Sequence, residues 1–224
     1  MINNLNNNYL KIDYKIILDA YSHGIFPMAE NIDSLDVFWV KPKKRGVIDP
    51  YKINISRKLK RFINKQPFKI KVNTNFIGVI EGCAEITNGR ENTWINPSIR
   101  DVFIDLHYKG YAHSIECYSN NDLVGGLYGV AVGGMFFGES MFSRMQNASK
   151  VALLHLVDRL KVGNFILLDT QFLTDHLKTM GAYEIDQESF VSILKKALKF
   201  NSDFYKIGKS GELDKNLYPQ SNNY

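Results

Sequence analysis

The chain has 224 residues, of which 45% are hydrophobic and 23% are charged, so it is long enough for one domain with its own core plus a small companion. The formal net charge is +5, and the only cysteines, Cys83 and Cys117, lack the spacing of a zinc site or a disulfide framework. No run approaches the ~18 apolar residues of a membrane span, and the Asn-rich start does not resemble a signal peptide, so we expect a cytoplasmic protein without membrane contact.

The first elements predict a small N-terminal domain that contains one cationic helix. A short helix over 15–22 ends near Gly24 and runs into a turn, and a strand is expected over 37–40. Ser56 is a suitable N-cap for the helix that follows it. Helical spacing gives this helix a basic side, which carries Arg57, Lys60, Arg61 and Lys65. Its opposite side faces a core and carries Leu59, Phe62 and Ile63.

Positive charge is concentrated around this helix. From Lys41 to Lys71, twelve Lys and Arg residues stand against the single acid Asp49, for a local net charge of +11, so the rest of the chain carries −6. Such an imbalance is typical of a protein that meets a polyanion with one end. A basic face that is merely solvated is the alternative, and charge alone does not separate the two.

Strands and helices alternate beyond residue 67. The predicted elements are, in order, helices over 76–86 and from Pro97 to just before Gly110, strands over 112–118, 123–132 and 135–138, a helix over 149–162, a strand over 165–169, a helix over 173–179, a strand over 182–185 and a helix over 188–200. The three consecutive strands make an antiparallel meander. The sequence therefore predicts an α+β fold with a mixed sheet flanked by helices. The expected boundaries are a small basic domain over 1–67, the main domain over 68–204 and a polar tail over 205–224.

Polar side chains follow two of the predicted strands. Glu139 and Asp169 each come directly after an apolar strand, and Gln171 lies two residues beyond Asp169, on the same face of an extended chain. Sites are commonly built at such strand ends, although a carboxylate there is also a frequent helix cap. The five histidines show no ligand spacing and no nucleophile motif is present, so we expect no metal.

Several long segments resemble a known family. They include AYSHGIFPM (20–28), ISRKLKRF (55–62), LHYKGYAHSIE (106–116), the block 123–153 with GESMFSR and NASK, LLDTQ (167–171) and HLKTMGAYEI (176–185). These segments run in order over about residues 20–190 and are similar to the leucyl/phenylalanyl-tRNA-protein transferases. The combination of GESMFSR, NASK and LDxQ is highly specific.

The resemblance implies an acetyltransferase-like (GNAT) main domain that works without coenzyme A. Consistent with this, the segment from Ser143 to Lys150, between the meander and the next helix, has no glycine with which to form a pyrophosphate cradle. The implied activity is transfer of Leu or Phe, with Met as a further donor, from aminoacyl-tRNA to the α-amino group of proteins that begin with Arg or Lys. We expect a monomer without a cofactor. An RNA-binding module without catalysis and a coenzyme-A-dependent N-acyltransferase are the alternatives.

The resemblance also assigns site residues. Asp169 and Gln171 match the family's catalytic pair, and Glu139 matches an acid of its substrate site. Tyr21 and Trp94 match aromatic positions around the aminoacyl end of the tRNA. Met28 and Phe103 match two further such positions, where the family frequently has Trp and Tyr respectively. The cationic helix, through the four basic residues on its exposed side, is expected to contact tRNA phosphates.

These residues suggest a mechanism. We expect Asp169 to orient or deprotonate the attacking amine, and Gln171 to donate a hydrogen bond to the ester carbonyl as it becomes an oxyanion. Glu139 is a candidate partner for the basic acceptor terminus. The candidates for an apolar pocket that accepts Leu or Phe, each of which also suits an ordinary core, are Leu127, Phe136, Met141, Leu153 and Leu168.

Overall fold

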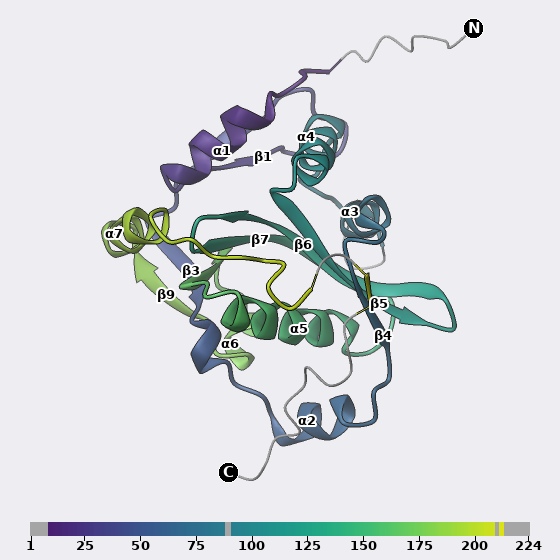
Figure 1. Cartoon of the computed structure of the whole chain (residues 1–224). Coiled ribbons are helices and arrows are strands. Elements are labelled where there is room, and N and C mark those ends of the chain that lie inside the picture. Colours follow the sequence, from purple (N-terminus) through teal and green to yellow (C-terminus); the bar gives the residue numbers. More distant parts are fainter. Residues whose placement is uncertain (1–8, 88–90, 209–210, 213–224) are drawn as a thin grey trace, which may run out of the picture.

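The computed structural model of the chain describes residues 9–87, 91–208 and 211–212, so most of the predicted tail over 205–224 lies outside the described residues. In the described part, the central mixed sheet has the strand order β10-β4-β5-β6-β7-β8-β3-β9 (Figure 1). Its strands are β3 (Lys44–Ile48), β4 (Lys69–Val72), β5 (Ala112–Ser119), β6 (Asp122–Val132), β7 (Met135–Ser143), β8 (Leu167–Gln171), β9 (Tyr183–Asp186) and β10 (Gly211–Glu212). A separate antiparallel pair consists of β1 (Phe26–Met28) and β2 (Phe38–Val40).

Helices cover both faces of the central sheet. They are α1 (Tyr14–Ser22), α2 (Arg57–Ile63), α3 (Phe76–Ala84), α4 (Pro97–Tyr108), α5 (Ala148–Val162), α6 (Asp175–Thr179) and α7 (Gln187–Ala197). One apolar core joins α1, α3, α4 and α7 to the sheet, and a second core joins α2, α5 and α6 to it (Figure 1). The predicted α+β class, with a mixed sheet flanked by helices, is confirmed. Within the described ranges, no helix is long and apolar enough to span a membrane.

The predicted meander is present as the antiparallel strands β5, β6 and β7. Asn120 and Asn121, between β5 and β6, have φ angles of 49° and 71°, the left-handed conformation that a tight hairpin turn requires. The end of β7 differs from the prediction, because the strand continues beyond Gly138 to Ser143 while it remains paired with β6.

This extension changes the place of the predicted carboxylates. Glu139 lies inside β7 and Asp169 lies inside β8, so the prediction that both follow the end of a strand is wrong. In β7, a glycine and two polar residues follow an apolar run, which resembles the end of a strand. The strand continues because its backbone hydrogen bonds to β6 do not depend on side-chain polarity.

Strand β3 connects the N-terminal part of the chain to the central sheet. It pairs antiparallel with β8 on one side and with β9 on the other. This strand was not predicted, because its Lys44 and Arg45 belong to the cationic run and obscure the apolar Val47 and Ile48. The boundary near residue 67 stays a prediction, although β3 precedes it in the sequence and lies in the central sheet.

Strands β7 and β8 are parallel neighbours that separate along their length. Their ladder runs from Met135 opposite Leu167 to Phe137 opposite Asp169. Beyond these pairs, both strands continue and border a cavity. The topology therefore brings the second half of β7 and the end of β8 to the same opening.

Candidate active site

A cavity of about 360 Å³ lies where β7 and β8 separate. Its wall is mostly apolar and includes residues of the sheet, the β1 strand, α5 and α6. The predicted site residues that line it are Met28, Trp94, Leu127, Glu139, Met141, Leu153, Leu168 and Gln171. Residues that are far apart in the sequence thus form one concave, apolar surface with a few polar groups, which is the usual composition of a small-molecule site.

Two predicted substrate contacts lie behind this wall. Phe136 is fully buried and stacks on Phe204 with ring centres 5.7 Å apart. Phe103 is also fully buried and meets the cavity-lining Tyr128 edge-on at 5.4 Å. Neither side chain lines the cavity, which corrects the prediction that they contact the substrate.

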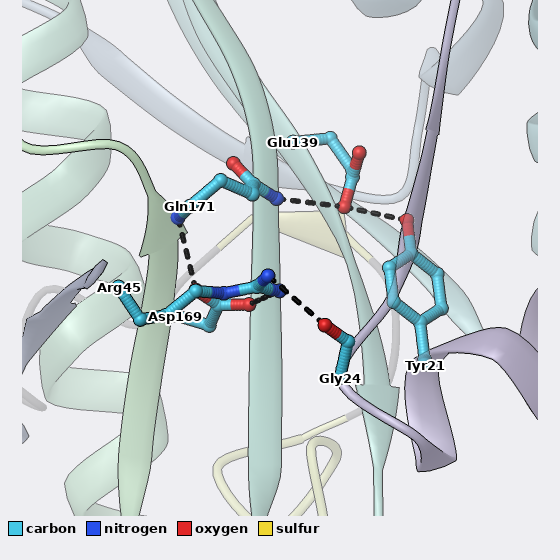
Figure 2. A network of polar contacts seen from close by, with 6 residues as sticks. All are labelled: Tyr21, Gly24, Arg45, Glu139, Asp169 and Gln171. Atoms are coloured by element: carbon cyan, nitrogen blue, oxygen red, sulfur yellow. Dashed lines mark hydrogen bonds and ion pairs between the residues drawn. The ribbon is translucent and has the colours of Figure 1, made fainter. Parts of the chain in front are cut away.

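Glu139 is a buried carboxylate in the cavity wall. Its Oε1 accepts hydrogen bonds from the Tyr21 hydroxyl at 2.6 Å and from Gln171 Nε2 at 3.1 Å (Figure 2). The Oε2 atom takes part in neither bond and is turned away from both partners in Figure 2. Burial raises the pKa of Glu139 to about 8. Tyr21 is fully buried, so it supports Glu139 from behind the wall instead of lining the cavity itself.

Asp169 is fully buried in an ion pair with Arg45. Arg45 Nε donates to Asp169 Oδ1 at 2.8 Å, and Arg45 Nη2 donates to Oδ2 at 2.6 Å (Figure 2). Both side chains have 0% exposure, and neither is among the residues that line the cavity. This geometry does not support the expected contact between Asp169 and the attacking amine, because both carboxylate oxygens already accept bonds from the guanidinium.

Asp169 instead holds the backbone of Gln171. Its Oδ1 accepts a hydrogen bond from the Gln171 N–H at 2.9 Å, in the manner of an Asx turn. Gln171 has a φ of 55°. The residues on either side of it are joined by a hydrogen bond of 2.6 Å, which the Phe172 N–H donates to the Thr170 carbonyl oxygen. A non-glycine residue in this left-handed conformation is strained, and such strain is characteristic of functional sites. The turn directs the Gln171 side chain toward Glu139.

Close approach of β3 helps to maintain this turn. The β3–β8 register shifts between Gly46 and Val47, opposite Gln171. A Cβ atom on Gly46 would lie 2.8 Å from the carbonyl carbon of Phe172 and 2.9 Å from the backbone nitrogen of Leu173. Gly46 therefore provides the space in which the chain turns after β8.

Sequence analysis missed several residues of the site. Arg45 was counted only as part of the cationic run, and no local signal distinguishes it from its exposed neighbours. His176 and Leu177 of α6 also line the cavity. The HLKTMGAYEI segment that contains them belongs to the family resemblance, so the motif indicates a role for this segment that residue spacing alone does not.

The cationic helix α2 has the predicted local structure. The Ser56 side chain accepts a hydrogen bond from the Leu59 N–H at 3.2 Å and caps the helix. Leu59 packs in the second core, and the exposed side carries Arg57, Lys60, Arg61 and, just after the helix, Lys65. The Asn54 N–H, shortly before α2, bonds the Met180 carbonyl oxygen at the end of α6. This bond connects the segment before α2 to the end of the helix that forms one wall of the cavity.

The raised pKa of Glu139 predicts a pH-dependent effect on stability. Because an unfolded Glu has a pKa of about 4.3, the folded chain holds the extra proton between that value and about 8, and stability falls as the pH rises through this window. Glu139→Gln removes the titration. Thermal melts should give similar midpoints for the two proteins at pH 5 and a lower midpoint for the unaltered protein at pH 9. A difference that does not change with pH would contradict the assignment.

An apolar cavity with a buried carboxylate and an amide in its wall, on a mixed sheet flanked by helices, defines an enzyme that holds an apolar group beside a polar reaction centre. A family model described as leucyl/phenylalanyl-tRNA protein transferase matches residues 47–195, and the model of that family's N-terminal domain matches residues 11–43. The chain belongs to the leucyl/phenylalanyl-tRNA protein transferase family.

Curated relatives with the name leucyl/phenylalanyl-tRNA–protein transferase agree with this placement. The one from Zymomonas mobilis is 51% identical over 91% of this chain and 76% of its own length. The one from Rhizorhabdus wittichii is 51% identical over 84% of this chain and 75% of its own length. The one from Nitrobacter winogradskyi is 50% identical over 87% of this chain and 86% of its own length. A solved structure described as that of L-PGS from Bacillus licheniformis covers 90% of this chain and 65% of its own at 11% identity, with a TM-score of 0.42 that is too low to support an inference.

Proposed function

We propose that the protein transfers Leu or Phe, and also Met, from aminoacyl-tRNA to the α-amino group of proteins that begin with Arg or Lys. The observation that carries this proposal is the placement of Glu139 and Gln171 in the wall of a mostly apolar cavity. The names of the relatives support the donor, and the cationic helix α2 supports a polyanionic ligand. The rest of the chain carries a net charge of −6, which suits a basic acceptor. We also propose that the enzyme acts as a monomer in the cytoplasm.

The cavity suits the side chain of the donor amino acid. Leu127, Met141, Leu153 and Leu168 present branched or flexible apolar surface to it. A pocket of this kind distinguishes similar apolar side chains by only about 1–3 kcal/mol per methylene, which agrees with acceptance of more than one donor. Trp94 and Met28 also line the cavity and are candidates to contact the terminal nucleotide.

The reaction needs little more than positioning and a proton acceptor. The donor is an activated ester. The acceptor amine has an ordinary pKa of about 7.7–8.0, which is close to the pKa of about 8 of Glu139, so a proton can pass from the amine to Glu139 at small cost in free energy. The amine nitrogen forms a bond to the ester carbonyl carbon, Glu139 accepts the amine proton, and the carbon–oxygen bond to the ribose breaks. The proton then passes to the departing ribose oxygen, and an amide N–H of Gln171 stabilises the oxyanion.

In this scheme Asp169 is a positioning residue. It holds the backbone of Gln171 and does not contact the amine, which replaces the expectation that it deprotonates the acceptor. Its contribution is geometric, since a displacement of about 1 Å at a reacting group can lower a rate by about 100-fold.

The tRNA is expected to rest on the exposed side of α2. Replacement of both Arg57 and Arg61 with Ala should weaken aminoacyl-tRNA binding by about tenfold or more, and the slope of log Kd against log salt should fall by about one for each lost phosphate contact. The rate at saturating tRNA should be unchanged. Filter binding over a salt titration measures both quantities.

A matched control removes the same charge elsewhere. Lys195 and Lys196 are exposed on α7, and their joint replacement with Ala should leave the salt slope as it is. An unaltered affinity and slope in the Arg57 and Arg61 variant would reject α2 as the tRNA contact.

A transfer assay tests the proposed function. The purified protein is incubated with labelled Phe-tRNA and a peptide that begins with Arg, and the label is expected at the peptide's N-terminus. An N-acetylated peptide should remain unlabelled. Binding of tRNA without transfer would instead indicate an RNA-binding module, and acetylation of the peptide by acetyl coenzyme A would indicate a coenzyme-A enzyme.

A further inference from the structure

Arg45 is a buried cation at the junction of three parts of the fold. Besides its two bonds to Asp169 in β8, its Nη1 donates to the Gly24 carbonyl oxygen at 3.2 Å. Its guanidinium carbon lies 4.7 Å from the ring centre of Phe26 in β1 and 4.6 Å from that of Phe190 in α7. The side chain therefore contacts the segment after α1, the central sheet and the C-terminal helix without exposure to water.

Two chains of contacts lead from Arg45 to the carboxylate of Glu139 (Figure 2). The first passes through Asp169, which holds the Gln171 backbone, and then through the Gln171 side chain. The second passes through Gly24, whose N–H donates a hydrogen bond of 3.0 Å to the carbonyl oxygen of Tyr21. It then reaches Glu139 through the Tyr21 hydroxyl. The two chains meet at Glu139 Oε1, so one guanidinium supports both groups that hold this oxygen.

The cost of burying the ion pair supports a geometric role. Removing both charges from water is expensive, and apolar side chains of similar volume would fill the same space without this penalty. The guanidinium has instead a rigid planar fork that fixes the direction of each N–H bond. Its fork matches the Asp169 carboxylate, and a third N–H remains for the Gly24 carbonyl oxygen.

We propose that Arg45 is a positioning residue of the transfer reaction, which holds Gln171 and Tyr21 in the arrangement that presents Glu139 to the acceptor amine. This inference rests on the proposed function. Arg45 touches neither donor nor acceptor, so its loss should lower kcat and leave the KM for aminoacyl-tRNA nearly unchanged.

Four variants separate positioning from simple structural support. Arg45→Met leaves Asp169 buried without its partner, and Arg45→Lys keeps the charge without the fork. The double variant Arg45→Met with Asp169→Leu replaces the ion pair by an apolar pair and should fold, but the Gln171 N–H then loses its acceptor. Arg100→Met is the matched control, since Arg100 forms its ion pair with Asp101 on the half-exposed surface of α4.

We expect kcat to fall by about 100-fold in Arg45→Met and in the double variant and by about tenfold in Arg45→Lys, with KM within about threefold. Arg100→Met should match the unaltered protein. If Arg45→Met does not fold, Arg45→Lys still decides, because it keeps Asp169 and the charge and lacks only the planar fork. A double variant with an unaltered melting temperature and a kcat within about threefold of the unaltered protein would overturn the inference.

A second readout does not depend on activity. The carbon-13 carboxyl resonance of Glu139, assigned by its absence from Glu139→Gln, is followed against pH. In the double variant, loss of the Asp169 charge lowers the pKa of Glu139 and loss of the Arg45 charge raises it, so these direct effects oppose each other. Loss of the Gln171 hydrogen bond raises the pKa of Glu139. A higher pKa of Glu139 in the double variant supports positioning of Gln171 by the Arg45–Asp169 pair, and an unchanged or lower pKa contradicts it. Absence of transfer by the unaltered protein would reject the proposed function while this measurement still tests the positioning.

Discussion

Replacement of Glu139 with Gln is expected to lower kcat for transfer of Phe or Leu by about 10²- to 10⁴-fold, the usual contribution of a general base. Gln keeps nearly the same volume and can still accept the hydrogen bond from the Tyr21 hydroxyl. It cannot take the amine proton, so the acceptor must lose this proton to water before it attacks. Binding of aminoacyl-tRNA is expected to stay within about threefold, because the proposed phosphate contacts lie on α2. Single-turnover rates at saturating Phe-tRNA measure the effect.

The same substitution on the surface provides the control. Glu188 is exposed in the first turn of α7, and Glu188→Gln should leave the rate unchanged. Thermal melts at pH 5 should show that Glu139→Gln is as stable as the unaltered protein, which excludes unfolding as the reason for a lost rate. A kcat within about threefold of the unaltered value would remove Glu139 from the proton transfer.

Gly46→Ala is also expected to have a large effect. The added Cβ would approach the backbone of Phe172 and Leu173 to 2.8 and 2.9 Å, so the segment after β8 must move. This movement displaces the strained turn at Gln171, for which a loss of about 100-fold in kcat is expected. The cost in stability should be modest, about 1–3 kcal/mol, as is typical of overpacking. Paired measurements of kcat and of urea denaturation separate the two effects.

Gly110→Ala is the control for the general cost of removing a glycine. Gly110 has a φ of 82°, and a Cβ atom placed there would have no neighbour within 4 Å. Its replacement should therefore lower stability through backbone strain, by about 1 kcal/mol, without a change in kcat. Equal losses of kcat in Gly46→Ala and Gly110→Ala would contradict a specific link between Gly46 and the Gln171 turn.

Local signals in the sequence predicted most of the elements. Asn96 caps α4 by accepting from the Ile99 N–H, and Pro97 occupies the first turn, as the sequence indicated. The meander and the basic side of α2 also followed from periodicity and turn residues. These features depend on hydrogen bonds and side-chain spacing within a few residues, which is why a single sequence reveals them.

The composition of the site was predicted in part. Position relative to the predicted strands indicated Glu139 and Gln171, the family resemblance added Trp94, and the structure places all three at one cavity. The resemblance also named Asp169, which the structure turns away from the cavity toward Arg45. Resemblance identifies which positions matter, but it does not show the direction in which a side chain points or what it contacts.

Motifs along the chain were enough to place it in its family, and short-range spacing was enough to predict most helices and strands and the cationic side of α2. The tertiary structure alone decided that Arg45 leaves its cationic run to pair with Asp169, 124 positions away, and that Gln171 adopts a left-handed turn beside Gly46. Burial of a charged side chain such as Arg45 costs free energy unless a partner offsets it, and Arg45 has that partner only because β8 becomes the neighbour of β3.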